Sequence, residues 1–463
     1  MDKIIKCVAF TIVTAVVISI AYRPLALKDT NGGESEIYSA TAEFYNTDRD
    51  LVDAVFLGSS HCYNSVYPAL LWENYGIASF DMAISAQSVE STYACLKEFL
   101  KRQSPKVVFI ETYTMISDEM NDEGSTIRNM LALKSSADSA RLVLESDIEN
   151  KSDYLLRWPI VHTRYRELTR DDYIRYGIDS YGRGAEMRMG EGGCFISEFA
   201  YKEEITTISD RNKKLVDDVL ALSKKYNFRP VFFLSPYTVF EGEKEISNGI
   251  KEYVESKGLT YIDFTGMTRA LGFDAAFDMM GDMHHLNMNG AKKITLSLGA
   301  YIDANFDLPD HRGDEDYYQW DKDLELYYHI LDINKLMDAY GTDDYLRLLS
   351  DCSGMKIILS LEGDFENTLE DLAYFRIDPS TVGIGGKWVY ENGNAVRVMD
   401  NLSGNTKIIG LSRYDAVKLT YNPDNLTSNV IYNLTPCVYT ENGLNVIAYD
   451  TVRNRLFDVS CFE

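Results

Sequence analysis

The first patterned segment of the chain is an apolar stretch near the N-terminus. Residues 4–22 form a run of 19 residues that carries no charge apart from Lys6, and Lys3 precedes it. At a rise of about 1.5 Å per residue this run reaches about 28 Å, close to the roughly 30 Å of a bilayer's hydrocarbon core. The pattern therefore predicts a transmembrane anchor over residues 1–22. The two lysines favour a cytoplasmic N-terminus and export of the rest of the chain.

Two other interpretations of this run stay open. Residues 19–21 read Ser-Ile-Ala, a passable small-x-small cleavage site, so the run is also compatible with a secretory signal peptide that is removed. A soluble protein with an apolar first helix is the remaining alternative. In the first two cases the bulk of the chain is extracytoplasmic, held at the cell membrane if the run is retained and secreted if it is cleaved.

After a polar stretch over residues 23–50, which we expect to be a stalk, short apolar runs alternate with helical patterns. The runs are rich in Val, Ile and Phe and end in turn residues, which is typical of buried strands. Strands that alternate with helices predict a parallel sheet covered on both faces, hence a three-layer α/β domain over residues 51–305. The expected strands are 54–58, 106–112, 229–236 and 259–264, and the expected helices include 91–102 and 210–226.

The last third of the chain has a different pattern. Residues 306–350 are dense in charges and aromatic side chains, and we expect a helical connector there. From residue 351 to 463 the chain shows short apolar runs broken by Gly, Asn-Gly and Asp, with one helical stretch at 367–375. This pattern is typical of strands and hairpins, so we expect a smaller α+β domain at the C-terminus.

Charge and cysteine content exclude several classes of function. The 46 Lys and Arg against 71 Asp and Glu give a net charge of −25, so the surface repels phosphate backbones and nucleic acid is a poor partner. The chain has no Cys-x-x-Cys pair, which makes a zinc ribbon or a thioredoxin-like site unlikely. Cys352, Cys437 and Cys461 could include one disulfide or could all be buried thiols, and the sequence leaves both alternatives open.

Two segments carry candidate chemistry. Residues 58–61, Gly-Ser-Ser-His, follow the first expected strand, where a tight turn presents a serine hydroxyl at a helix start. Far along the chain, Asp282 precedes His285 by three residues, close enough to accept the Nδ1–H of the imidazole and leave Nε2 as a base. A serine, a histidine and an aspartate are what activation of a serine hydroxyl requires.

These two segments resemble the motifs of the SGNH/GDSL hydrolase superfamily over roughly residues 50–305. The likeness is greatest to its membrane-anchored branch, which includes the D-alanyl-transfer protein of lipoteichoic acid synthesis and the polysaccharide O-acetyltransferases. The resemblance implies a catalytic triad of Ser60, Asp282 and His285, with His284 a spectator. It also implies an oxyanion hole formed by the backbone N–H groups of Ser60 and Ala86, where Ala86 stands in place of the family's glycine. The family's asparagine donor after the third strand is absent, and residues 112–114 read Thr-Tyr-Thr.

Other residues near these motifs are weaker candidates. His61, Glu111 and Tyr113 are candidate substrate-binding residues, and Glu111 could equally be a capping carboxylate. Residues 157–158 and 162–165 form a basic and aromatic patch, which could line a groove for sugars or an acidic polymer or could pack its aromatics inward. The chain has no phosphate-binding glycine loop, His-Glu-x-x-His or calcium loop, so we expect neither a cofactor nor a metal.

The C-terminal segment has its own resemblance. Residues 443–463, Gly-Leu-Asn-Val-Ile-Ala-Tyr-Asp and onward, look like the closing hairpin of the interleukin-like EMT inducer (ILEI) domain, and the likeness extends upstream to residue 355. Relatives of that domain occur as stems of glycan-processing enzymes. The resemblance therefore implies a carbohydrate-binding role for residues 351–463, with a purely structural role as the alternative.

Together these observations predict a membrane-anchored, extracytoplasmic serine esterase or O-acyltransferase. Its expected substrate is an acetyl or D-alanyl ester of a cell-surface polysaccharide or teichoic-acid-like polymer, and a membrane-bound acyl-donor partner fits the same hypothesis. The alternative is a non-catalytic surface protein that binds or assembles glycans and carries a degenerate SGNH domain, an interpretation that the missing asparagine favours.

Overall fold

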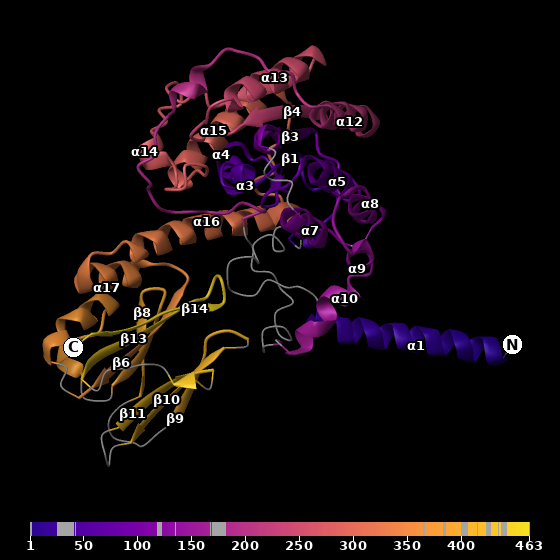
Figure 1. The fold of residues 1–463 in the computed structure, drawn as a ribbon. Helices are drawn as coiled ribbons and strands as arrows, with labels where there is room; N and C mark the ends of the chain where they lie inside the picture. The colour runs from indigo at the N-terminus through magenta and orange to yellow at the C-terminus, as the bar shows by residue number, and fades with distance from the viewer. Residues whose placement is uncertain are drawn as a thin grey trace. The chain divides into compact units, whose positions relative to one another are not determined.

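The computed structural model describes most of the chain as an α/β protein with two compact units, Met1–Leu324 and Glu325–Glu463 (Figure 1). The larger unit contains a parallel sheet and the smaller one contains antiparallel sheets. The described residues are 2–25, 41, 43–117, 123–134, 136–166, 168, 182–363, 366–382, 386–399, 406–413, 415–422, 427–433, 435–436 and 442–462.

The sheet of the larger unit confirms the parallel sheet predicted from the alternating pattern. Its strand order is β2-β1-β3-β4-β5, and every neighbouring pair is parallel. All residues of β1 and β3 are buried, so both faces of the sheet are covered. The sequence predicted four of these strands and missed β2, which has only three residues. The strands are β1 (Ala54–Leu57), β2 (Ser79–Asp81), β3 (Val107–Glu111), β4 (Arg229–Leu234) and β5 (Thr260–Asp263).

Helices of the larger unit pack on this sheet in pairs. α5 contacts β1 and α12, whereas α4 contacts β2 and α15. The apolar spacing predicted for α12 is borne out, because Leu215, Val219 and Leu222 form its buried side. The longer helices are α1 (Asp2–Leu25), α4 (Pro68–Tyr75), α5 (Val89–Phe99), α7 (Glu123–Ala132), α8 (Ala137–Glu145), α12 (Asp210–Tyr226), α13 (Glu243–Ser256) and α15 (Met288–Asn305). The shorter ones are α3 (Ser60–Tyr63), α6 (Tyr113–Ile116), α9 (Lys151–Leu156), α10 (Trp158–Val161), η2 (His162–Arg166), η3 (Glu198–Tyr201), α14 (Ala275–Asp278) and η4 (Glu315–Tyr317).

The N-terminal segments differ from the expectation in part of the stalk. Among the described residues, no helix combines the length and the apolar character needed to cross a membrane. Residues 26–40 of the predicted stalk lie outside the described residues. Residues 43–50, by contrast, belong to the folded unit, because Phe44 is buried and its ring contacts Phe80 and Phe99. The anchor itself stays a prediction of the sequence.

The smaller unit combines two antiparallel sheets with helices. Alternate residues of β6 enter two cores: Ile357 and Leu359 pack with Leu346 of α17, whereas Ile358 packs with Val417 of β10. The first sheet has the order β14-β13-β6-β7-β8 and the second β12-β11-β10-β9. The strands are β6 (Met355–Glu362), β7 (Lys387–Glu391), β8 (Asn394–Met399), β9 (Thr406–Gly410), β10 (Ala416–Asn422), β11 (Thr427–Tyr432), β12 (Thr435–Pro436), β13 (Gly443–Asp450) and β14 (Arg455–Phe462). The helices are α16 (Tyr318–Met337), which begins in the larger unit, α17 (Gly341–Asp351), η5 (Glu366–Thr368), η6 (Glu370–Phe375) and η7 (Pro379–Thr381).

The cysteines of this unit are only partly described. Cys352 carries a free thiol, and Sγ of Cys461 contacts Oδ1 of Asn445 at 3.2 Å. Cys437 lies outside the described residues, so the alternative of a disulfide that includes it stays as the sequence left it.

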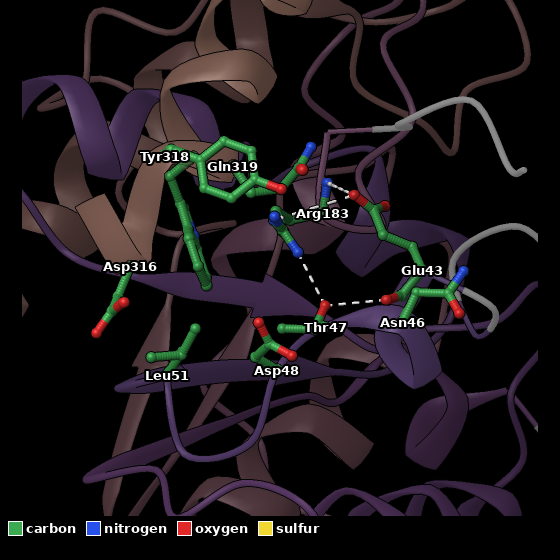
Figure 2. Close-up of a pocket in the computed structure, with 10 residues that line it drawn as sticks. Glu43, Asn46, Thr47, Asp48, Leu51, Arg183, Asp316, Tyr318 and Gln319 are labelled. Carbon is green, nitrogen blue, oxygen red and sulfur yellow. Dashed lines mark hydrogen bonds and ion pairs between the residues drawn. The ribbon is translucent and has the colours of Figure 1, made fainter. Parts of the chain in front are cut away.

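A buried arginine joins three distant segments of the larger unit. The Arg183 side chain is buried and forms an ion pair with Asp323, with 2.6 Å between Nε and Oδ2. It also donates from Nη1 to the Thr47 hydroxyl at 2.8 Å, and its guanidinium lies 4.2 Å from the ring centre of Trp320. Figure 2 shows Arg183 and Thr47 on the wall of a cavity of about 150 Å³. This one side chain therefore connects residues 43–50 and the start of α16 to the segment that carries Arg183.

We expect Asp323→Ala to destabilise the larger unit by about 3 kcal/mol, because it removes the closer carboxylate of the buried Arg183 charge and leaves only Glu43, 4.0 Å from Nε. Urea unfolding followed by tryptophan fluorescence measures the change. Glu145→Ala is the matched control, since it removes a carboxylate from an exposed ion pair with Arg141 and should cost no more than about 0.5 kcal/mol. Equal effects of the two variants would show that burial of the Arg183 pair adds nothing to stability.

Candidate active site

The turn after β1 brings the candidate nucleophile to the start of a short helix. Ser60 is the first residue of α3, and the Ser59 hydroxyl caps that helix by accepting a hydrogen bond from the His61 N–H at 3.3 Å. Gly58 has a φ of +153°, and a Cβ at this position would lie 2.7 Å from the Cβ of Glu111. Only glycine fits such a close approach, so the first residue of the motif is needed to form the turn.

The structure brings Ser60, His285 and Asp282 together, as their expected roles require. The Ser60 Oγ lies 2.7 Å from Nε2 of His285, and Nδ1 of His285 lies 2.6 Å from Oδ2 of Asp282. The other carboxylate oxygen of Asp282 accepts the backbone N–H groups of His284 and His285 at 3.0 Å each. Asp282 thus orients both the imidazole and the backbone that carries it.

The segment after the histidine is held in place by a helix cap. The Asn287 side chain caps α15 by accepting from the N–H groups of Asn289 and Gly290. Its Nδ2 donates to the carbonyl of Phe277 at 2.8 Å. A Cβ on Gly290 would lie 2.2 Å from the carbonyl oxygen of Asp278, which explains the glycine at this position. The Asn and Gly of this motif therefore build the local structure that positions His285.

The charges in the site suit a neutral base beside an ionised acid. Partial burial acts to raise the pKa of Asp282, but hydrogen bonds from the His285 ring and from two backbone N–H groups outweigh it and lower the pKa to about 2. Burial lowers the pKa of His285 although its contact with Asp282 acts in the opposite direction. His285 is therefore neutral at neutral pH, with a free lone pair for the Ser60 proton.

Two backbone N–H groups, in the segments after β1 and β2, are the candidates for an oxyanion hole. Those of Ser60 and Ala86 make no hydrogen bond with another described residue. Ala86 has a φ of +50°, a left-handed conformation that costs alanine roughly 1 to 2 kcal/mol and that a glycine would adopt freely. The resemblance had put Ala86 in the position of a glycine, and its backbone keeps the conformation that a glycine favours.

Side chains from other segments hold the Ala86 loop. The Asn129 side chain of α7 is buried, and its Nδ2 lies 3.3 Å from the carbonyl oxygens of both Ser85 and Ala86. Oε1 of Gln87 accepts the Gly58 N–H at 3.1 Å, which ties this loop to the turn that carries Ser60. Sequence reasoning missed Asn129, because it lies in the long insertion after residue 115 and no local motif marks it.

Two of the three hydroxyls that follow β3 are engaged with other residues. The Thr112 hydroxyl donates to the carbonyl of Phe233 at 3.1 Å and contacts the Tyr261 hydroxyl. The Tyr113 hydroxyl lies 3.2 Å from Nδ1 of His284. Loss of one oxyanion donor costs about 3 to 4 kcal/mol of transition-state stabilisation, so this difference from the family pattern matters for the rate.

The three candidate substrate-binding residues have buried side chains. His61, Glu111 and Tyr113 are 2%, 1% and 5% exposed, and the rings of His61 and Tyr113 stack with their centres 3.6 Å apart. The His61 ring centre is 5.2 Å from that of His285. Such burial fits a supporting role for these side chains better than contact with a substrate.

Two buried carboxyl groups lie under the nucleophile turn, and sequence reasoning had not singled out the first of them. Burial raises the pKa of Asp81 and of Glu111 to about 8 each. Asp81 accepts the Ala83 N–H at 2.8 Å and contacts the Cys62 thiol, and Glu111 accepts the Tyr113 N–H at 3.0 Å. Both are therefore largely protonated at neutral pH, which keeps negative charge away from the site of the expected oxyanion. Within the described part of the chain, no group of three or more His, Cys, Asp or Glu side chains is arranged to hold a metal ion.

These carboxyl groups make the stability of the fold depend on pH. In the unfolded chain they ionise near pH 4, but in the folded chain they keep their protons up to about pH 8. The unfolded state binds fewer protons in this window, so the free energy of unfolding falls as the pH rises, by up to about 1.4 kcal/mol per pH unit for each group. We expect Asp81→Asn and Glu111→Gln to lose less stability than the wild type between about pH 5 and 8 in thermal unfolding. Parallel curves for wild type and variants would contradict the raised pKa values.

A scan against models of known protein families finds no match for this chain, and a search of curated proteins finds none either. The case for a function therefore depends on the geometry around Ser60 and on the resemblance of its motifs.

Proposed function

We propose that the chain is an extracytoplasmic serine esterase or O-acyltransferase that acts on the acyl esters of a cell-surface polysaccharide. The observation that carries this proposal is the continuous hydrogen-bonded series from the Ser60 hydroxyl through His285 to Asp282, at 2.7 and 2.6 Å. Two candidate oxyanion donors, the backbone N–H groups of Ser60 and Ala86, have no acceptor among the described residues.

In the first half of the reaction, the Ser60 oxygen attacks the ester carbonyl carbon and its proton moves to Nε2 of His285. The former carbonyl oxygen becomes an anion that accepts hydrogen bonds from the N–H groups of Ser60 and Ala86. Asp282 stabilises the imidazolium without taking its proton. When the tetrahedral intermediate collapses, the alcohol leaves with the proton from His285, and the acyl group stays on Ser60.

The second half returns the acyl group to an acceptor. His285 takes a proton from water, which gives hydrolysis, or from a sugar hydroxyl, which gives transfer, and the resulting oxygen attacks the acyl-Ser60 ester. The bond between the acyl carbon and Ser60 Oγ then breaks, and Ser60 takes the proton back from His285. The resemblance to the membrane-anchored branch supports acetyl or D-alanyl groups, a polysaccharide or teichoic-acid-like acceptor, and a membrane-bound acyl-donor partner.

The same proposal assigns the two units to families. The larger unit is proposed as an SGNH hydrolase-like domain, supported by the parallel sheet and by the motifs at its strand ends. The smaller is proposed as an ILEI-like carbohydrate-binding domain. The antiparallel pairing of β13 (Gly443–Asp450) with β14 (Arg455–Phe462) agrees with the closing hairpin on which that resemblance depends.

The alternative proposal is a non-catalytic surface protein that binds or assembles glycans. One observation favours it: the Thr112 hydroxyl, at the position after β3, is engaged with Phe233 and Tyr261 rather than free for an oxyanion. Under this alternative Ser60 reacts with no acyl donor.

Reaction of the full-length protein with a fluorophosphonate and with p-nitrophenyl acetate separates the two proposals. We expect wild type to be labelled and to turn over the ester, and we expect Ser60→Ala to lose the label and about a thousandfold or more of the turnover. Ser223→Ala is the matched control, because it removes a buried serine hydroxyl on α12 that donates to the Leu220 carbonyl, and it leaves the turn that carries Ser60 intact. If wild type is not labelled and turns over neither p-nitrophenyl acetate nor an acetylated glycan, the non-catalytic alternative is favoured. Labelling that survives in Ser60→Ala would contradict Ser60 as the nucleophile.

We expect Asn129→Ala to lower kcat by about 10- to 100-fold with little change in KM, because it frees the backbone that presents the Ala86 N–H. Steady-state hydrolysis of p-nitrophenyl acetate measures both constants. Arg128→Ala, next to it on α7, serves as the control and should behave as wild type. A kcat unchanged in Asn129→Ala would mean that the Ala86 loop holds its conformation without this clamp.

A further inference from the structure

The basic and aromatic patch found in the sequence is exposed rather than packed inward. It lies on three short consecutive helices, α9, α10 and η2, which together cover residues 151–166. Leu156, Trp158 and Tyr165 are 72%, 44% and 59% exposed. Trp158 also differs from the other three tryptophans of the chain, Trp72, Trp320 and Trp388, which are all buried. We call residues 151–166 the interfacial segment.

The interfacial segment is basic in a chain that is strongly acidic. It carries Lys151, Arg157, Arg164 and Arg166 against Asp153 alone, whereas the whole chain has a net charge of −25. Exposed apolar and aromatic side chains next to clustered cations are the composition of protein surfaces that lie on anionic membranes.

The segment lies at the end of the N-terminal helix. The Arg164 guanidinium donates from Nη1 to the carbonyl oxygen of Leu25, the last residue of α1, at 2.9 Å. α1 itself exposes apolar side chains along its length, among them Phe10 and Val13. The interfacial segment therefore contacts the end of the predicted anchor, at the point where a membrane-embedded helix would emerge into the headgroup region.

We propose that the interfacial segment binds the headgroup region of a bilayer that contains anionic phospholipid. Trp158 and Tyr165 lie at the depth where an aromatic ring meets both acyl chains and water, and Leu156 enters the apolar layer. The cationic side chains pair with lipid phosphates. This inference does not depend on ester chemistry at Ser60.

Such binding would fix the candidate active site relative to the membrane. Nη2 of Arg157 donates to the carbonyl of Met130 in α7 at 3.0 Å. The same helix carries Asn129, which holds the Ala86 loop. Through α7, these two contacts connect the interfacial segment to the Ala86 loop. A lipid-bound segment therefore sets the position of that loop relative to the bilayer surface.

Trp158 provides a direct test in the full-length protein. The protein is reconstituted in phosphatidylcholine vesicles, with and without phosphatidylglycerol, that contain lipids brominated close to the headgroup. Bromine quenches tryptophans that touch the lipid, and the other three tryptophans are buried. We expect quenching that is stronger with phosphatidylglycerol and that disappears in Trp158→Phe.

Variants distinguish binding from mere proximity to an anchor. Leu156→Glu should remove most of the Trp158 quenching, whereas Ile205→Glu, a control at another exposed apolar side chain, should leave it unchanged. Quenching that is absent from wild type, or that is equal in wild type and Leu156→Glu, would overturn the proposal. It would also be overturned if soluble polyglycerol phosphate changed Trp158 emission as much as anionic vesicles do, because the segment would then bind an acidic polymer.

Discussion

The hydrogen bond between Ser60 and His285 is the contact on which the candidate site depends, and it joins side chains 225 positions apart in the sequence. A parallel sheet makes this contact feasible, since the carboxyl ends of its strands meet at one edge. The turn after β1 carries Ser60, the loop after β2 carries Ala86, and Tyr113 follows β3. The segment that carries Asp282 and His285 completes the group from the far end of the domain, immediately before α15.

Near this contact, carboxyl groups with similar intrinsic pKa values have opposite protonation states because their surroundings differ. Asp282 is partly exposed, and three hydrogen bonds lower its pKa to about 2. Asp81 and Glu111 also accept hydrogen bonds, but their complete burial outweighs these and raises the pKa of each to about 8. A negative charge is therefore kept where it can stabilise an imidazolium. It is removed from beneath Ser60, where it would oppose the oxyanion. The division of states follows from hydrogen-bond donors and burial rather than from residue type.

The sequence predicted what depends on short-range patterns. Apolar runs marked β1, β3, β4 and β5, and the two motifs marked the triad residues that the structure brings together. Features that depend on distant contacts left no such signal. β2 is too short to show a pattern, Asn129 reaches the Ala86 loop from 43 positions away, and the packing of Phe44 is invisible in a polar stretch. Exposure of Trp158 was equally undetermined, because aromatic side chains at helical spacing are compatible with both a buried and an exposed face.

In the proposed reaction, the choice between hydrolysis and transfer depends on access of water to the acyl-Ser60 ester rather than on the triad. Ser60 is 7% exposed and stands beside the buried rings of His61 and Tyr113, so little water reaches its oxygen from the protein side. Access from the other side depends on what covers the site during the reaction. A site held near a membrane surface receives donors and acceptors confined to that surface, and a bound polymer excludes water from the ester. If the interfacial segment orients the site in this way, transfer to a glycan hydroxyl is the chemically favoured outcome, and the same triad in bulk water would hydrolyse its acyl donor.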